Sequence, residues 1–155
     1  MVISRLERIW LFIGSAMLAI FLIVLIADAV VMGATPPSGM TTVDPATVLK
    51  SGQFQTPRAY QTGPNAWMVH VAAFQFGFLP NPIRVPAGAK VTFMVASADV
   101  VHGFEIVDTD VNTMVIPGYV SQITHTFNHK GNYLILCNEY CGSGHHLMSD
   151  TLEVY

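Results

Sequence analysis

Trp67-Met-Val-His-Val-Ala-Ala73 has a period of two, so its odd-numbered residues fall on one face of an extended chain. Those residues are apolar, while the other face carries His70 between two smaller or unbranched side chains. The same period recurs at Val91-Thr-Phe-Met-Val-Ala96. Alternation rich in β-branched and aromatic residues predicts two β-strands.

Further strand-like segments follow between clear turn signals. The turns are marked by Asn81-Pro82, Pro86-Ala-Gly88, Pro117-Gly118 and Lys130-Gly-Asn132. The additional predicted strands are Val101–Ile106, Tyr119–Phe127, Asn132–Cys137 and Thr151–Tyr155. Six or more short strands between residues 65 and 155 predict an all-β domain built as a β-sandwich.

The N-terminal part has a different character. Residues 9–27 contain no charged side chain, and the apolar stretch continues past Asp28 to Met32. A helix that rises about 1.5 Å per residue needs roughly 20 such residues to cross a bilayer. The run therefore predicts one transmembrane helix and a single-pass protein in contact with the lipid bilayer.

A cleaved signal peptide is the competing interpretation, because Ala27-Asp-Ala29 resembles a cleavage site. Signal peptides usually carry apolar runs of about 7–15 residues, which favours the anchor. Arg5 and Arg8 precede the run, and the next basic residue is Lys50. The positive-inside rule then predicts a cytoplasmic N-terminus, with the β domain on the outer (periplasmic or extracellular) face of the cell membrane.

These features divide the chain into three predicted parts. Residues 1–33 form the anchor, residues 34–64 form a connecting segment rich in proline, and residues 65–155 form the β domain. The formal net charge is −3 and no basic patch is present, which argues against a nucleic-acid partner.

Both cysteines of the chain lie in Cys137-Asn-Glu-Tyr-Cys141-Gly-Ser-Gly-His145-His-Leu-Met148. Two thiolates, an imidazole and a thioether within twelve residues form a soft donor set that suits copper better than hard cations. A predicted strand leads into this stretch, and its glycines allow a tight loop. A further histidine, His102, lies beside another predicted strand and could complete the site.

Three other interpretations compete with copper. A disulfide between Cys137 and Cys141 is possible outside the cytoplasm, but it leaves His145 and Met148 without a role. A structural zinc site of two cysteines and two histidines also has no use for Met148. Covalent haem attachment requires Cys-x-x-Cys-His, whereas three residues separate these cysteines.

The number of cysteines bears on the kind of copper site. A mononuclear blue site uses one cysteine, two histidines and a weak axial methionine, so the second cysteine would be surplus. Two thiolates that each bridge two metal ions give a dinuclear centre with one histidine on each copper. The second cysteine favours the dinuclear centre.

The Cys137–Met148 stretch resembles the CuA loop of cytochrome c oxidase subunit II, whose pattern is Cys-x-Glu-x-Cys-x-x-x-His-x-x-Met. His102 lies where that family has its other histidine ligand, and Asn81-Pro-Ile83 also matches. The resemblance covers nearly the whole chain. It implies a cupredoxin-like Greek-key β-sandwich preceded by one N-terminal transmembrane helix.

The resemblance also implies a role for each site residue. Cys137 and Cys141 are expected to bridge two coppers, and His102 and His145 each to bind one of them. Met148 is expected to be a weak ligand of one copper. The backbone carbonyl of Glu139 is expected to bind the other, and the Glu139 side chain could help to hold Mg²⁺ at a subunit interface.

One departure concerns the anchor. The common subunit II has two helices before its copper domain, whereas this chain has one predicted helix, which resembles the B-family, ba-type oxidases. In that group a phenylalanine-rich run lies near the docking surface for the electron donor. The matching residues here are Phe74, Phe76 and Phe78, although they could equally line one face of a strand.

The resemblance implies a subunit of a proton-translocating oxidoreductase. Its copper centre accepts electrons from a soluble cytochrome c or a small copper protein. It passes them to haem in the catalytic subunit I, where O₂ is reduced. This chain has no haem ligand pair of its own, so it is not expected to carry out the oxygen chemistry alone. The alternatives are a CuA subunit of a nitric oxide reductase and a membrane-anchored mononuclear copper carrier. A nitrous oxide reductase domain and a copper chaperone fit the length and the strand-borne His102 less well.

Overall fold

The computed structural model describes residues 4–31 and 41–155. They fall into two compact units, one holding the helix and the other all the strands, and each is described by itself. The predicted parts 1–33 and 34–64 therefore lie partly outside the described residues, and their boundaries stay a prediction.

Helix α1 (Arg5–Val31) is the apolar helix that the sequence predicts. A capping box starts it, because the Ser4 hydroxyl accepts from the Glu7 amide at 3.2 Å and the Glu7 carboxylate accepts from the Ser4 amide at 2.7 Å. None of its side chains is buried in the chain. Among the described residues it is the one helix long and apolar enough to cross a membrane.

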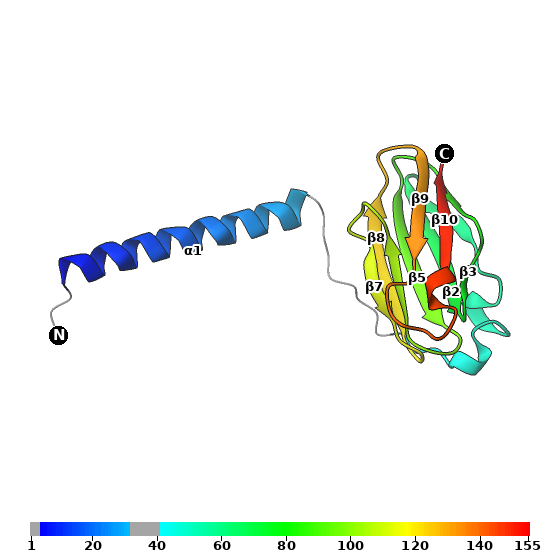
Figure 1. Ribbon diagram of the computed structural model, residues 1–155. Helices are drawn as coiled ribbons and strands as arrows, with labels where there is room; N and C mark the ends of the chain where they lie inside the picture. Colours follow the sequence, from blue (N-terminus) through cyan, green and yellow to red (C-terminus); the bar gives the residue numbers. More distant parts are fainter. Residues whose placement is uncertain (1–3, 32–40) are drawn as a thin grey trace. The chain divides into compact units, whose positions relative to one another are not determined.

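The strands form a sandwich of two five-stranded sheets, which confirms the predicted cupredoxin-like all-β fold (Figure 1). The first sheet has the order β1-β2-β5-β8, with β3 also paired to β2, and the second has the order β4-β10-β9-β6-β7. The strands of the first sheet are β1 (Ala59–Gly63), β2 (Ala66–Phe74), β3 (Gly77–Leu79), β5 (Lys90–Ser97) and β8 (Val120–Thr126). The strands of the second sheet are β4 (Ile83–Val85), β6 (His102–Ile106), β7 (Asn112–Val115), β9 (Gly131–Leu136) and β10 (Ser149–Val154).

The alternation in the sequence places the core as expected. Val69 and Val71 of β2 and Phe93 of β5 are fully buried between the sheets. Phe93 packs against Phe104 of the second sheet with ring centroids 5.6 Å apart. Each predicted strand overlaps an observed one. Strands β1, β3, β4 and β7 were not predicted, because they are short and lack a long alternating pattern.

The even-numbered face of β2 is covered as well. The segment before β1 contains two short 3-10 helices, η1 (Pro45–Thr47) and η2 (Gly52–Phe54). Val48 and Phe54 from this segment pack with Ala72, Ala96 and Val120 in a second small core. The residues expected only to connect the anchor and the domain thus form part of the sandwich's outer layer.

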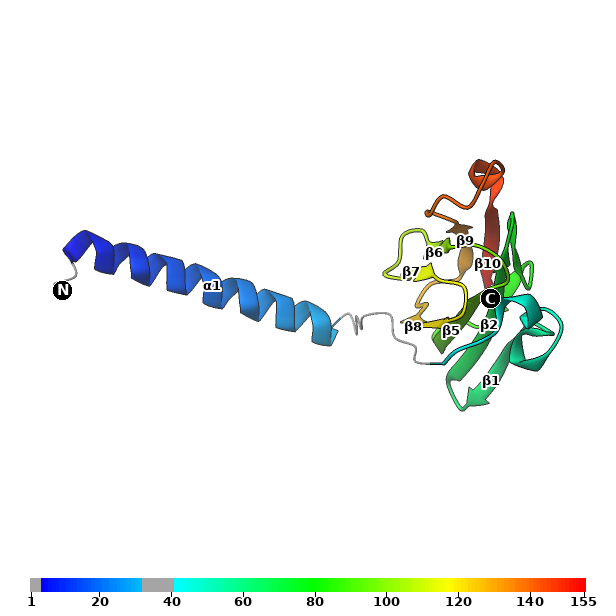
Figure 2. The same cartoon turned by 90° about the horizontal axis from the view of Figure 1, so that it is seen from below.

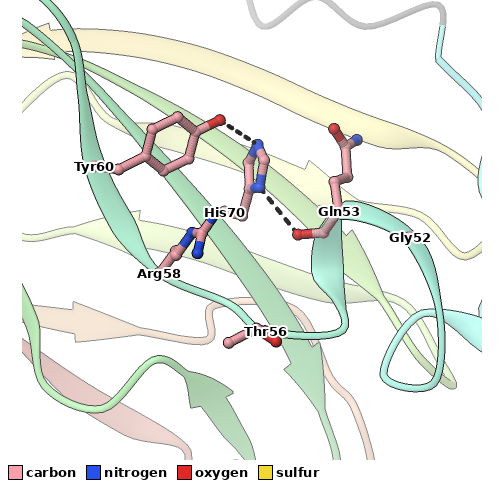
Figure 3. A pocket seen from close by; sticks show the side chains of 6 residues that line it. All are labelled: Gly52, Gln53, Thr56, Arg58, Tyr60 and His70. Atoms are coloured by element: carbon pink, nitrogen blue, oxygen red, sulfur yellow. Dashed lines mark hydrogen bonds between the residues drawn. The ribbon is translucent and has the colours of Figure 1, made fainter.

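His70 fastens this layer to β2. Its Nδ1 lies 3.0 Å from the Gln53 carbonyl and its Nε2 lies 3.3 Å from the Tyr60 hydroxyl (Figure 3). A neutral imidazole with its proton on Nδ1 satisfies both contacts, because Nε2 then accepts from the Tyr60 hydroxyl. These residues line an open pocket of about 210 Å³, which also includes Arg58 and Thr56. Because both ring nitrogens are engaged, His70 acts here as a structural residue.

The buried His70 predicts a pH dependence of stability. Burial lowers the pKa of His70 below its ordinary 6.5, and the nearby Arg58 charge contributes in the same direction, although the Gln53 contact opposes it. The unfolded chain therefore binds this proton more readily than the folded chain. The resulting contribution to stability is complete above pH 6.5 and is lost as the pH falls below it.

We expect the free energy of unfolding of the full chain in detergent to fall between about pH 7.5 and pH 5.5, with a shallower fall in His70→Gln. Urea unfolding followed by tryptophan fluorescence at both pH values measures it. The same substitution at the exposed His129 is the matched control. An equal fall of the unfolding free energy with pH in the wild type and His70→Gln would contradict this role of His70.

Candidate metal centre

The predicted ligand stretch is the connection between two paired strands. β9 and β10 are antiparallel, and Leu136 at the end of β9 faces Ser149 at the start of β10. Figures 1 and 2 show the two strands side by side, in orange and red. The Cys137 amide extends the ladder by donating to the Met148 carbonyl at 3.2 Å. Residues 137–148, called the ligand loop below, are thus closed at their base by the sheet.

His102 reaches the ligand loop from the neighbouring strand. It is the first residue of β6, which runs antiparallel to β9 with Glu105 facing Leu136. The next residue must be glycine, because a Cβ on Gly103 would lie 1.8 Å from the Asn138 side-chain oxygen. Asn138 also donates to Glu105 at 3.0 Å, which ties the loop to β6. Sheet register therefore decides where His102 lies.

The predicted donor atoms converge in the structure. The Cys137 and Cys141 sulfurs are 3.8 Å apart, and His102 Nδ1 lies 3.9 Å from the Cys137 sulfur. On the other side, His145 Nδ1 and the Met148 sulfur each lie 3.6 Å from the Cys141 sulfur. Each sulfur thus has one imidazole nitrogen beside it, and the candidate metal cluster of His102, Cys137 and Cys141 is fully buried.

Glu139 contributes through its backbone. Its carbonyl oxygen lies 3.2 Å from the Cys137 sulfur. The Glu139 side chain is half-buried. This arrangement is compatible with the carbonyl as a ligand, which was the role implied by the resemblance.

No disulfide joins Cys137 to Cys141. Their sulfur separation of 3.8 Å is well beyond the roughly 2.05 Å of a disulfide. Burial raises the pKa of the Cys141 thiol to about 11, and the adjacent Cys137 adds to the effect. A bound metal would deprotonate the coordinating thiols outright and neutralise the two thiolates that result. The donor set therefore fits a soft metal.

Asp99 orients His102, a role that the sequence analysis did not assign to it. Asp99 Oδ1 accepts from His102 Nε2 at 2.8 Å, which leaves the lone pair of Nδ1 directed at the cluster. Burial by itself would raise the pKa of Asp99. The hydrogen bonds from His102, from the Gln75 amide and from the Val100 amide outweigh that effect and hold the pKa below its ordinary value. A carboxylate three residues before the histidine was the available signal.

The three phenylalanines of the predicted docking run lie in different environments. Phe78 is buried, with its ring edge-on to Phe104 at 5.6 Å. Phe74 is half-buried, and Phe76 is 37% exposed against the ligand loop. The loop itself contributes two more exposed apolar side chains, Tyr140 and Leu147, which were not predicted as docking residues.

The remaining histidines lie apart from the donor cluster. His70 fastens the outer layer, His125 pairs with Asp110, and His146 is exposed. Within the ligand loop it is His145 whose ring nitrogen lies next to a cysteine sulfur.

The chain is similar to known proteins over most of its length. The sequence model of the family described as "Cytochrome C oxidase subunit II, periplasmic domain" matches residues 65–154. A cytochrome c oxidase subunit 2 of Thermus thermophilus is 44% identical over 153 residues, covering 96% of this chain and 90% of that protein. Another Thermus thermophilus protein of the same name is 46% identical over 124 residues, covering 79% of this chain and 92% of that protein.

Solved structures give the same result for the fold. A chain of a heme-copper terminal oxidase dimer superposes with a TM-score of 0.79 at 30% identity, covering 97% of this chain and all of that one. The periplasmic domain of subunit II of the Bradyrhizobium japonicum cytochrome oxidase has a TM-score of 0.54 at 20% identity, covering 64% of this chain and 87% of that one. With its predicted donors gathered at the end of a cupredoxin-like sandwich, the chain belongs to the cytochrome c oxidase subunit II family.

Proposed function

We propose that this chain is the electron-accepting subunit of a haem–copper terminal oxidase. The observation that carries the proposal is the pair of buried cysteine sulfurs 3.8 Å apart, each with a histidine nitrogen within 4 Å. Family membership makes the chain part of a haem–copper oxidoreductase complex and implies a CuA copper site. Subunit I of that complex is the expected membrane partner.

The residues of the site suit a dinuclear copper centre. Cys137 and Cys141 would bridge two coppers, with His102 on one and His145 on the other. The Met148 sulfur lies 3.6 Å from the Cys141 sulfur and the Glu139 carbonyl 3.2 Å from the Cys137 sulfur, and they would complete the two coordination spheres. When bound, such a centre accepts and releases one electron that both coppers share. A Mg²⁺ ion near the Glu139 side chain, at the interface with subunit I, is part of the proposal.

The protein's own contribution is a fixed and dry ligand cage. Two strand ends and a neighbouring strand position the donors, and His102 is completely buried. Asp99 holds the His102 ring in one orientation, so the imidazole need not turn when the charge at the centre changes. Ligands that stay in place keep the structural cost of electron transfer small.

The surface beside the cage suits an apolar contact with the donor. Phe76, Tyr140 and Leu147 are exposed, and the Tyr140 ring stands edge-on to the His145 ring at 5.8 Å. We propose that a soluble cytochrome c or a small copper protein docks on this apolar surface. The exposure of Phe76 supports it as the docking member of the phenylalanine run, with Phe74 at the margin.

The chain fits a membrane-anchored protein, given its apolar N-terminal helix and its periplasmic-domain family. We propose that residues 1–33 are the anchor with a cytoplasmic N-terminus, and that residues 34–64 connect it to the copper domain, residues 65–155, outside the cell membrane. One membrane-length helix among residues 4–31 and 41–155 supports a B-family oxidase. We also propose O₂ as the final electron acceptor. Identifying the product that the catalytic partner forms would distinguish O₂ reduction from nitric oxide reduction.

The function predicts direct reduction by a cytochrome. We expect the copper-loaded full chain in detergent to oxidise reduced cytochrome c in stopped-flow absorbance measurements, with loss of the reaction in Cys141→Ser. Leu147→Asp should slow the bimolecular step by about 10-fold, because it puts a charge in the apolar contact. His129→Asp, at an exposed position outside the docking surface, is the control.

The salt dependence of the electron-transfer rate distinguishes an apolar docking contact from a charged one. An apolar interface predicts little change in the rate as ionic strength rises, whereas steep slowing with salt would show that charge steers the encounter. Reduction of Cys141→Ser at the wild-type rate would contradict the proposed function.

Neighbouring histidines provide a sharper test of the ligand assignment. We expect His145→Ala to lower copper affinity by at least about 10-fold and to change the visible charge-transfer spectrum, because one copper loses its imidazole. His146→Ala should leave both unchanged, since His146 is exposed one residue further on. Equal effects of the two substitutions, measured by chelator competition and absorbance, would remove His145 from the ligand set.

A further inference from the structure

Gln75 is an exposed residue in the turn between β2 and β3. It forms hydrogen bonds through both its backbone amide and its side chain. Its backbone amide donates to Asp99 Oδ2 at 2.7 Å. Its side-chain amide donates to the Cys141 carbonyl oxygen at 2.5 Å. One residue therefore connects the Asp99 carboxylate with the ligand loop, over sequence separations of 24 and 66 residues.

The Asp99 end of this connection is itself fixed. The other oxygen of the same carboxylate accepts from His102 Nε2 at 2.8 Å and from the Val100 amide at 2.7 Å. The buried Ser97 hydroxyl accepts from the Asp99 amide at 3.2 Å. A continuous path of hydrogen bonds thus runs from the His102 ring through Asp99 and Gln75 to the backbone of Cys141.

The ligand loop is shaped to receive this turn. A Cβ on Gly144 would lie 2.5 Å from the Phe76 ring, and a Cβ on Gly142 would lie 2.8 Å from the Gln75 side-chain nitrogen. Gly142 also has a φ of +130°, which side chains rarely adopt. Glycine at both positions lets the Gln75–Phe76 turn lie directly on the loop, so the contact is built from both sides.

Glutamine is well matched to this position. Holding a long exposed side chain in one rotamer costs conformational entropy, which its hydrogen bond must offset. A neutral amide donates to the carbonyl without bringing charge toward two thiolates. A glutamate of the same shape would instead place a carboxylate oxygen against the carbonyl oxygen of Cys141.

We infer that Gln75 is a positioning residue of the copper centre, which fixes the Cys141 carbonyl and thereby holds the Cys141 sulfur at its distance from Cys137. The inference rests on the proposed function, in which these two sulfurs carry the copper. Gln75 touches no donor atom of the cluster directly. Its effect therefore passes through the Cys141 backbone on one side and through Asp99 and His102 on the other.

The test compares Gln75→Met with the wild type, using the copper-loaded full chain in detergent. Methionine keeps the length of the side chain and removes the donor. We expect copper affinity, from chelator competition, to fall about 10-fold. We also expect the reduction potential and the copper hyperfine pattern in EPR to shift. The unfolding midpoint of the copper-free chain should stay unchanged, because the bond lies at an exposed turn.

Gln61→Met is the matched control. Gln61 is an exposed glutamine whose side-chain amide also donates to a backbone carbonyl, that of Gly63, at 2.9 Å. Gln75→Glu should disturb the hyperfine pattern more than Gln75→Met, which keeps the test informative if methionine packs favourably. A wild-type affinity, potential and spectrum in Gln75→Met, or equal changes in Gln61→Met, would overturn the inference.

The proposed function and the positioning role of Gln75 fail in different ways. If the wild type itself shows no electron shared between two coppers, the proposed function fails. If the wild type shows it and both Gln75 variants reproduce it unchanged, only the positioning role fails.

Discussion

The structure depends on holding two cysteine sulfurs 3.8 Å apart in a buried site. In the absence of metal no charge on Cys141 holds this distance, because burial and the neighbouring sulfur raise the pKa of the Cys141 thiol to about 11 and keep it protonated at neutral pH. A flexible loop would let the sulfurs separate. The fold must therefore fix the ligand loop before any metal arrives, and many features around the cluster serve that requirement.

The sandwich fixes the ligand loop by placing the ligands at strand ends. The register of β9 with β10 brings the two ends of the loop together, and the register of β6 with β9 sets His102 beside it. Gly103 and Gly144 allow close contacts that a larger residue would prevent. Phe104 of β6 packs against Phe78 of β3 and Phe93 of β5, two strands of the opposite sheet, which holds β6 against that sheet.

The sequence predicted the parts that local patterns determine. Alternation over residues 67–73 and 91–96 located the two central strands, and uncharged length located α1. The spacing of two cysteines, a histidine and a methionine indicated a soft metal site because those donors are seldom grouped otherwise. Long-range contacts could not be predicted in this way. Asp99 and Gln75 are ordinary polar residues until folding brings them to the site. Val48 and Phe54 lie in a proline- and glycine-rich stretch whose packing on the sheet has no periodic signal.

The phenylalanine run shows the same limit. Phe74, Phe76 and Phe78 alternate in sequence, which would place them together on one face of a continuous strand. The chain instead turns between β2 and β3, so Phe76 faces the ligand loop while Phe78 enters the core. A break of register inside a short alternating run cannot be recognised from composition.

The proposed electron-transfer role requires that one chain hold two coppers bridged by Cys137 and Cys141. The copper-to-protein ratio of the full chain in detergent, taken together with its EPR spectrum, tests this requirement. We predict two coppers per chain and hyperfine structure from one unpaired electron shared by both nuclei. One copper per chain with the electron confined to a single nucleus would contradict the dinuclear centre.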